Sequence, residues 1–591
     1  MAGLSLVHAL LWWWANHREG VWLQAPAIDQ AHDLTTAWLF HRALAAIDPD
    51  GLARTWVAGS SVHTPLVPLC SAVLMRLFGA TRVTAEAILP VFIAIWIVAV
   101  YACVRQLFGS TTARFTTLLT TAFPVFLIYS RTYLFEQPLA AMFAVACWWL
   151  IASDGFRRGG HSVGFGVAAG AVALTRGGGF VLLTGPVLVT LSSIRAAPDR
   201  TRRWTHCAAA LGVAVLLAST WYGPNFRAFS DYVRQATYGQ DAVARTGRTA
   251  AFSWDAAVYY GTWLIAQGPG WPMLLLVVGA AASGLSGERR PKNLRPMAGA
   301  LCAVFAIDFV FLLAGMQRQT ARYFLPLMPL VALAIAGIVR RVEWPAVRRG
   351  LAALVALLAL HHVVALSLTF PLGPRRTAAP YVRGIPLWDH RTYFRTLVDF
   401  YKLRTPADDF RIPEIVHFLG TVPIGPRAIV AVVGTPHGFF HRNGLQLESI
   451  RQQRQWRWLT DAYVRRGTGP LQVALPEADV ILVRSEGPSG VSREELMRAA
   501  PALTDRAAFQ SVRSFTVGDG SVVTVFVRVS GSSRAERRPS APLPRYRQSL
   551  FSTARSLTAP VEARRALSDD RRQASPVDMD RRDSPDRRPS R

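Results

Sequence analysis

Long apolar segments recur through the first two thirds of this 591-residue chain and limit the folds open to it. A helix rises about 1.5 Å per residue, so about 20 residues cross a hydrocarbon core of about 30 Å. Such segments occupy residues 85–104, 132–152, 297–316, 323–339 and 351–370. We therefore predict an α-helical polytopic membrane protein with about 11 transmembrane helices, or about 12 or 13 with juxtamembrane helices included.

The first apolar stretch, residues 4–15, is short for a membrane span. It lacks the basic leader and small-residue cleavage site of a signal peptide. Either the three tryptophans at 12–14 complete the helix at the interface, or the given start lacks part of the helix; the second interpretation is preferred. The five cysteines show neither metal-ligand spacing nor a disulfide framework, so we expect them to pack as small apolar side chains.

The net charge of +28 follows the expected topology. With the N-terminus inside, alternate loops are rich in Arg and Lys, at 157–158, 195–203, 289–295 and 340–349. Short loops of this kind stay cytoplasmic and attract anionic lipids. We therefore expect a multi-pass protein of the inner (plasma) membrane that contacts membrane lipids and has no nucleic-acid partner. The intervening loops, and everything after residue 370, are predicted to be extracytoplasmic.

Three regions differ in composition. Residues 1–370 are predicted to form the transmembrane domain, and residues 371–530 a small extracytoplasmic α/β domain. In the second region we expect strands at 428–433 and 478–483, a hairpin at 511–529, and helices at 412–419, 452–466 and 493–500. Residues 531–591 are basic, lack apolar periodicity and are predicted to be a disordered tail, either a solvated linker or a segment that binds anionic lipid or polysaccharide; the linker is preferred.

An acidic cluster follows the first apolar stretch, at the start of a helix predicted over 34–47. Because residues three and four apart share a helix face, Asp29, His32 and Asp33 can face one cavity. Carboxylates at the mouth of a membrane bundle are costly and usually serve chemistry or transport. The alternative is that Asp29 only caps the helix, since Asp is a preferred N-cap residue.

A second acid, Glu136, lies about one turn inside the next predicted span, where an unpaired carboxylate is expensive. Arg131, five residues earlier, is the expected partner. An ion pair that only locks two helix ends is the alternative to a functional role. Asp308, inside another span, is expected to make a polar contact between helices, and a role in lipid binding is the less favoured alternative.

Three arginines are predicted to lie on the same side as these acids. They are Arg176, followed by three glycines, and Arg318 and Arg322. The guanidinium group offers a fixed fork of donors suited to phosphate oxygens, including those of a lipid-linked phosphate. Snorkelling at a helix end is an equal alternative for Arg176, whereas phosphate binding is favoured for Arg318 and Arg322.

The order and sidedness of these motifs, over residues 25–370, resemble the GT-C glycosyltransferases. More narrowly they are similar to the protein mannosyltransferase and aminoarabinose transferase type. The motifs are Asp29-Gln-Ala-His32, His63-Thr-Pro-Leu-Val-Pro68, Leu77-Phe-Gly79, Tyr129-Ser-Arg131 with Glu136, Leu174-Thr-Arg176, and Arg322-Tyr-Phe-Leu-Pro-Leu-Met-Pro329.

The resemblance implies a GT-C fold and a role for each motif. Asp29 matches the family's proposed catalytic base, and Glu136 its second acidic position. Arg318 and Arg322 fall where the family contacts donor phosphate. Gln30 replaces the acid that usually follows the first Asp, which weakens any metal site there; no metal ligands are assigned, and a divalent cation bridging Asp29 and Glu136 is only an option.

The implied reaction transfers a sugar from a polyprenyl-phosphate donor to an acceptor hydroxyl on the extracytoplasmic face, with inversion at the anomeric carbon. The acceptor is a glycan, a lipid or a protein. Two other classes stay open: a polytopic transporter or flippase for a lipid-linked or anionic substrate, and a catalytically inactive scaffold, which Gln30 would suit.

Overall fold

The computed structural model describes residues 1–18, 26, 28–195, 197–238, 254–282, 294–315, 321–367, 381–382, 385–386, 410–426, 428–434, 440–454, 456–459, 462–463, 478–485, 509–518 and 520–529. All of them belong to one compact unit, Met1–Arg537. Statements below about what is present or absent concern these residues.

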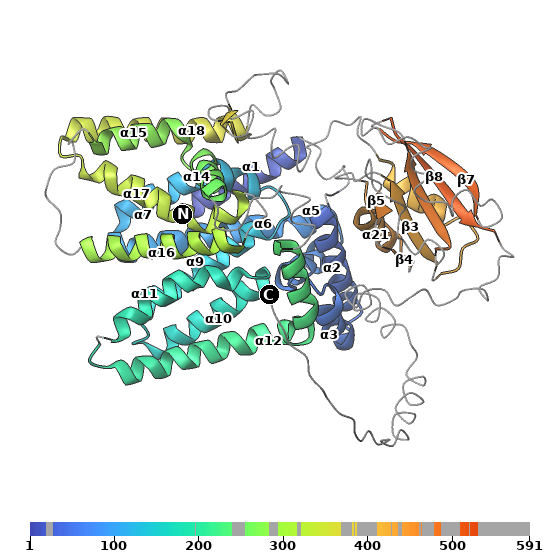
Figure 1. Ribbon diagram of the computed structural model, residues 1–591, viewed down its shortest axis with the longest axis horizontal. Coiled ribbons are helices and arrows are strands. Elements are labelled where there is room, and N and C mark those ends of the chain that lie inside the picture. The colour runs from blue at the N-terminus through green and yellow to red at the C-terminus, as the bar shows by residue number, and fades with distance from the viewer. Residues whose placement is uncertain are drawn as a thin grey trace, which may run out of the picture. The chain divides into compact units, whose positions relative to one another are not determined.

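Helices make up the described part of the chain as far as residue 367 (Figure 1). They are α1 (Ala2–Arg18), α2 (Ile28–Ala45), α3 (Pro49–Ala58), α4 (Leu66–Phe78), α5 (Arg82–Glu86), α6 (Ile88–Phe108), α7 (Ser110–Thr121), α8 (Pro124–Tyr129), α9 (Glu136–Ala152), α10 (Gly159–Thr175), the 3-10 helix η2 (Gly179–Leu183), α11 (Thr184–Arg195), α12 (Arg200–Tyr238), α14 (Trp254–Gln267), α15 (Gly270–Ala282), α16 (Leu294–Gly315), the 3-10 helix η3 (Ala321–Leu327), α17 (Met328–Arg341) and α18 (Pro345–Ser367).

Four described helical segments are long and apolar enough to cross a membrane: Arg82–Phe108, Arg200–Arg234, Arg322–Arg341 and Pro345–Val364. Five shorter apolar helices accompany them, among them Glu136–Ala152 and Gly299–Val310. The described residues of each apolar window named in the sequence lie mostly in helices, although 85–104 spans α5 and α6 and 323–339 spans η3 and α17. The expected number of about 11 spans stays a prediction.

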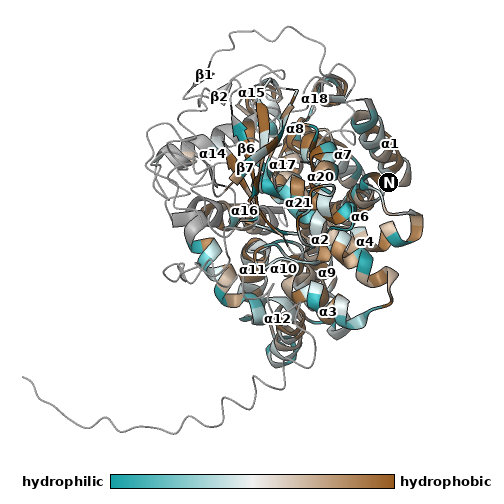
Figure 2. Cartoon of the chain, turned by 90° about the vertical axis from the view of Figure 1, so that its right-hand side faces the viewer, coloured by the Kyte–Doolittle hydropathy of each residue, from teal (hydrophilic) through white to brown (hydrophobic). Residues whose placement is uncertain are grey.

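The bundle core lies where α6 and α9 pack together and where α10 packs between α9 and α12. Figure 1 shows α10 and α12 running side by side. Small residues permit this contact, as a Cβ on Gly166 would lie 2.4 Å from the Ala210 carbonyl oxygen. Close packing of small residues is a common way to associate helices in a membrane. Apolar residues run along much of the bundle in Figure 2.

A mixed sheet follows the helices, with the strand order β4-β3-β6-β8-β7 and β5 also paired with β3. Its strands are β3 (Ile429–Gly434), β4 (Arg457–Trp458), β5 (Ala462–Tyr463), β6 (Val480–Ser485), β7 (Phe509–Thr516) and β8 (Val522–Arg528), and a separate pair joins β1 (Tyr381–Val382) to β2 (Ile385–Pro386). β3 runs parallel to β4, β5 and β6, whereas β8 is antiparallel to β6 and β7. Helix α20 (Ile412–Leu419) buries its apolar face in the core of this sheet.

The expected strands and the hairpin are present, and the helix expected at 412–419 has those bounds. The helix expected at 452–466 is wrong. Helix α21 (Arg442–Arg451) ends just before this segment, Gln453 has a φ of 59°, and β4 and β5 follow. Trp456 and Trp458 alternate into the sheet core, which favours strand pairing over the helical periodicity. Residues 493–500 and 531–591 lie outside the described residues.

Helix α21 also contacts α2. The Nε2 atom of His441 lies 3.2 Å from the carbonyl oxygen of Pro26, and Arg42 donates to the carbonyl of Ile450. These contacts place α21 and His441 against α2, the helix that carries Asp29, His32 and Asp33.

Candidate functional site

Asp29 lies in the first turn of α2, at its second residue. A carboxylate in the first turn is stabilised by the positive end of the helix dipole. This position is inside the helix, so Asp29 is not its N-cap residue. The Asp29 side chain is 46% exposed, and its Oδ2 atom lies 3.8 Å from a terminal nitrogen of Arg322. Asp29 is therefore accessible to a reactant while it faces a guanidinium group.

Glu136 connects two arginines that are distant in sequence. Its Oε1 atom lies 2.7 Å from Arg176 and 2.9 Å from the Nε atom of Arg322. The Glu136 side chain is 1% exposed and that of Arg322 is 6% exposed, so water screens this cluster weakly. Although burial by itself lowers the pKa of Arg176, the Glu136 carboxylate raises it above its ordinary value. Arg176 is thus held as a cation, and Glu136 fixes the position of both guanidinium groups.

The three glycines after Arg176 permit this arrangement. Gly178 has a φ of +80°, which favours glycine, and allows the chain to turn from α10 into η2. A Cβ on Gly179 would lie 2.6 Å from the side chain of Leu139, one turn along α9 from Glu136. The turn therefore packs directly on the helix whose first residue is the shared acid.

Tyr323 supports both arginines. Arg176 donates to its hydroxyl oxygen at 3.2 Å. The guanidinium carbons of Arg176 and Arg322 lie 5.1 and 5.4 Å from the centre of its ring, within the range of cation–π attraction. Because η3 carries Arg322 and Tyr323 in succession, one short helix supplies both a cation and the ring beneath the pair.

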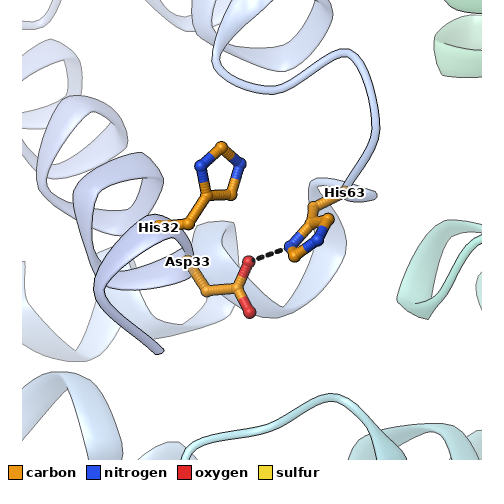
Figure 3. A group of neighbouring side chains, drawn as sticks. All are labelled: His32, Asp33 and His63. Atoms are coloured by element: carbon orange, nitrogen blue, oxygen red, sulfur yellow. Dashed lines mark hydrogen bonds and ion pairs between the residues drawn. The ribbon is translucent and has the colours of Figure 1, made fainter. Parts of the chain in front are cut away.

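A dyad of the buried carboxylate of Asp33 and the partly buried imidazole of His63 lies one turn along α2 from Asp29 (Figure 3). The Nδ1 atom of His63 lies 2.6 Å from Oδ1 of Asp33. Burial raises the pKa of Asp33. Burial lowers the pKa of His63, but the carboxylates of Asp33 and Asp29 outweigh it, and the net pKa is raised above the ordinary value.

Ser60 fixes the second histidine and the loop around it. Its hydroxyl lies 2.9 Å from Nε2 of His32 and accepts the His63 backbone N–H at 2.8 Å. Burial lowers the pKa of His32 to about 3, so this imidazole is neutral. From α12, Trp221 donates to the Ser60 carbonyl and Asn225 to the Val57 carbonyl, which anchors the loop.

His32, Asp33 and His63 could hold a metal ion, since one ligand atom from each lies within 4.8 Å of the others. Two imidazoles and a carboxylate suit a transition metal. However, His63 and Asp33 are engaged with each other and His32 with Ser60. The bridge considered between Asp29 and Glu136 fits less well, because two guanidinium groups already contact Glu136.

The expected partner of Glu136, Arg131, is wrong. Among the described residues Glu136 pairs with Arg176 and Arg322, and Arg131 instead donates to Ser367. Arg131 comes before α9 whereas Glu136 is its first residue, and the fold turns Glu136 toward η3 and the α10–η2 turn. Arg318 lies outside the described residues. The polar helix contact expected of Asp308 is present, since its Oδ1 accepts the Gly185 N–H at 3.1 Å.

Sequence reasoning assigned no role to His63, Ser60 or Tyr323. In the sequence His63 stands out only as the first residue of a motif, and Tyr323 only as the neighbour of Arg322. The available signal for His63 is an imidazole in the loop between α3 and α4. The signal for Tyr323 was an aromatic ring beside a buried cation.

The charges of this cluster lie at helix ends. Asp29 and Glu136 are in first turns, Arg176 directly follows α10, and Arg322 is in η3. The arrangement presents a half-exposed carboxylate next to two oriented guanidinium groups. Such a site can accept a proton at one point and stabilise an anion at another.

Comparisons with known proteins bear on the family resemblance and the fold. Residues 62–222 match the family model described as dolichyl-phosphate-mannose-protein mannosyltransferase. The structure of ArnT from Cupriavidus metallidurans in the apo state is 15% identical, with a TM-score of 0.50, and the match covers 89% of this chain and 97% of that one. No curated protein matches the sequence.

Two further solved structures are similar. ArnT from Cupriavidus metallidurans bound to undecaprenyl phosphate is 14% identical, with a TM-score of 0.51, over 90% of this chain and 98% of that one. The arabinofuranosyltransferase AftD from Mycobacteria is 17% identical, with a TM-score of 0.51, over 90% of this chain and 40% of that one.

The chain therefore has the fold of the GT-C membrane glycosyltransferases. Within that class, the match over residues 62–222 and the likeness to ArnT confirm the resemblance to the protein mannosyltransferase and aminoarabinose transferase type.

Proposed function

We propose that this protein is an integral-membrane glycosyltransferase that transfers a sugar from a polyprenyl-phosphate donor to an acceptor hydroxyl on the extracytoplasmic face. The observation that carries the proposal is the position of Arg322, which lies 2.9 Å from Glu136 and 3.8 Å from Asp29. It joins the candidate base and the candidate phosphate-binding residues in one cluster. The donor class is supported by the ArnT structure bound to undecaprenyl phosphate.

In the proposed reaction, the acceptor oxygen attacks the anomeric carbon from the side opposite the phosphate. The bond between that carbon and the phosphate oxygen breaks, its electron pair leaves with the phosphate, and the configuration inverts. The acceptor proton passes to the Asp29 carboxylate. Positioned proton transfer of this kind contributes about 10² to 10⁴ in rate.

Arg176 and Arg322 would stabilise the departing lipid phosphate, a term of similar or larger size. Glu136 acts as a positioning residue, because it orients both guanidinium groups before the donor arrives. His32, Asp33 and Arg131 remain substrate-binding candidates, and Arg318 is proposed with them from the sequence alone. The acceptor is a glycan, lipid or protein hydroxyl.

The proposed orientation places the site and the α/β domain outside the cytoplasm of the inner membrane. It rests on the Arg- and Lys-rich loops, which alternate with the segments that carry the site. No divalent cation is required for the reaction as written. A cation on His32, Asp33 and His63 remains an option with its own test, described below.

A lipid flippase is the rival function. Transporter sites lie near the bilayer midplane, at interrupted helices. The acids and arginines of this cluster instead lie at helix ends. This placement favours transfer at the membrane surface over transport through the bundle.

The decisive experiment measures transfer of labelled sugar from a panel of polyprenyl-phosphate sugars to membranes that contain the full chain. We expect Asp29→Asn to reduce transfer by about 10² to 10⁴ at equal expression. Asp50→Asn is the matched control, because Asp50 is an exposed acid in the first turn of the neighbouring helix α3.

Equal loss in the two variants, or full activity in Asp29→Asn, would contradict the assigned base. Labelled lipid that appears on the opposite leaflet without transfer would establish the flippase. Absence of both transfer and movement with every donor would favour the inactive scaffold.

A further inference from the structure

A cavity of about 720 Å³ opens between α6, α7 and α9, with Met1 also at its lining, away from the site described above. Its position follows from α9, which begins with Glu136 and carries Trp148 at the cavity. Twelve residues of helix separate the two by about 18 Å, at about 1.5 Å per residue. α6 runs parallel to α9, since Cys103 contacts the Ala144 carbonyl and Gln106 the Ile151 carbonyl. The cavity therefore lies toward the end of the bundle remote from Glu136.

The charged side chains that line this cavity are both arginines. Arg105 comes from the last turn of α6 and Arg114 from the first turns of α7, on either side of the bend at Gly109. Neither has a carboxylate partner within the described part of the chain. Two cations without counter-charge beside a cavity of this size suit an anionic group.

Both helices continue from their arginine into an exposed apolar face. On α6, Val91, Val98 and Arg105 are spaced by seven residues and share one face, and the two valines are 44% and 53% exposed. On α7, Leu118 lies one turn beyond Arg114 and is 51% exposed. On both helices the arginine lies nearer the end of the bundle remote from Glu136, and the exposed apolar residues lie nearer its middle.

The arginines at the remote end suit an anionic head group, and the exposed apolar residues next to them suit an acyl chain. This arrangement matches an amphiphile better than a soluble anion. Tyr101 and Trp148 also line the cavity. Amphipathic aromatic rings of this kind gather at the level of lipid head groups.

We propose that the cavity binds the phosphate head group of an anionic membrane lipid, with Arg105 and Arg114 on the phosphate and an acyl chain along Val98 and Val91. The site is separate from the proposed donor site. It serves to hold the remote ends of α6, α7 and α9 together around a lipid.

The test uses the full chain reconstituted into nanodiscs of phosphatidylcholine with increasing phosphatidylglycerol, and counts retained lipids by native mass spectrometry after extraction into detergent. A cationic residue near a membrane surface contributes about fivefold in affinity for anionic lipid. We expect Arg105→Gln with Arg114→Gln to lower phosphatidylglycerol retention by about 25-fold. Arg105→Lys with Arg114→Lys keeps the charge and should retain most of it.

Arg348→Gln is the matched control, an exposed arginine in the first turn of α18 that does not line the cavity. Equal loss in this control would mean general surface attraction and would overturn the site. Unchanged retention in the double Gln variant, with an unchanged Tm, would do the same. Displacement of the lipid by millimolar inorganic phosphate or glycerol phosphate would show a small-anion site and contradict the role of the apolar face.

Discussion

The Nδ1 atom of His63 lies 2.6 Å from Oδ1 of Asp33, across a separation of 30 residues. The pair joins the loop before α4 to the helix that carries Asp29. Because the net pKa of His63 is raised, the folded protein binds more protons at this residue than the unfolded chain above pH 6.5. Its stabilising effect is complete below about pH 6.5 and is lost as the pH rises through the raised value.

We therefore expect the stability difference between the wild type and His63→Gln to have its full size at about pH 6.5 and to shrink as the pH rises further through the raised pKa. The measurement is Tm in detergent with EDTA present, so that no metal contributes. Asp33→Asn should abolish the same pH dependence. A difference that grows as the pH rises would show that the imidazole is not held charged.

Glu136→Gln should destabilise the protein by about 3 kcal/mol, because it leaves two close guanidinium groups without their buried counter-charge. Thermal unfolding of the purified chain measures this change. Glu136→Gln combined with Arg176→Gln should recover part of the loss, since the repulsion is then removed.

The control for this series is Glu414→Gln, which breaks the exposed ion pair with Arg411 and should change Tm little. If the exposed and buried pairs respond alike, the buried cluster does not contribute as described.

Tyr323→Phe should weaken use of the donor about tenfold in kcat/KM. It removes the hydroxyl that accepts from Arg176 and keeps the ring beneath both arginines, and a hydrogen bond to a charged group contributes about 1.5 kcal/mol. Tyr323→Leu should cost more, because the cation–π contacts are lost as well. Equal activity of the two variants would assign the effect to the hydroxyl alone.

Gly179→Ala should lower stability by about 1–3 kcal/mol and reduce activity, as the new methyl group presses on buried Leu139 and displaces the turn that holds Arg176. Gly212→Ala is the control. Its Cβ would meet nothing within 4 Å on α12, and alanine in place of glycine there should stabilise the helix by up to about 1 kcal/mol. Loss in both variants would indicate a general intolerance of the bundle.

Removal of divalent cations with EDTA should leave sugar transfer unchanged, because Glu136 is already neutralised by arginines and the Asp33 and His63 side chains satisfy each other. The assay compares treated and untreated membranes. Activity that falls with EDTA and returns with added Mn²⁺ or Mg²⁺ would require a bound cation, and His32→Ala would then show whether the His32, Asp33 and His63 group supplies it.

The helices could be predicted from the sequence because a membrane helix is marked by a continuous run of apolar residues, which a single sequence displays directly. The windows at 132–152 and 351–370 correspond to α9 and α18 within a few residues. The helix expected at 452–466 is wrong because Arg457 and Trp458 form β4 and pair with β3. This contact joins distant segments, and local periodicity does not report it.

The sequence predicts which acidic and basic residues belong to the site, but it does not predict which of them pair with each other. Glu136 and Arg176 stood out because charges at the ends of apolar segments are costly. Proximity in the sequence favours Arg131 as the partner of Glu136, whereas the fold supplies Arg176 and Arg322. Tyr323 and His63 act through neighbours that are far along the chain, and a single sequence gives no distances between such segments.

The placement of the charges at helix ends has a consequence for how such a protein can change. Inside the membrane every backbone N–H and C=O group must be hydrogen-bonded within its helix, because lipid offers no partner. Side chains at the helix ends take no part in those bonds. A substitution at Asp29 or Arg176, or a longer turn after it, leaves those internal bonds closed. New specificity can therefore arise in the turns while the backbone hydrogen bonds of the membrane helices stay intact.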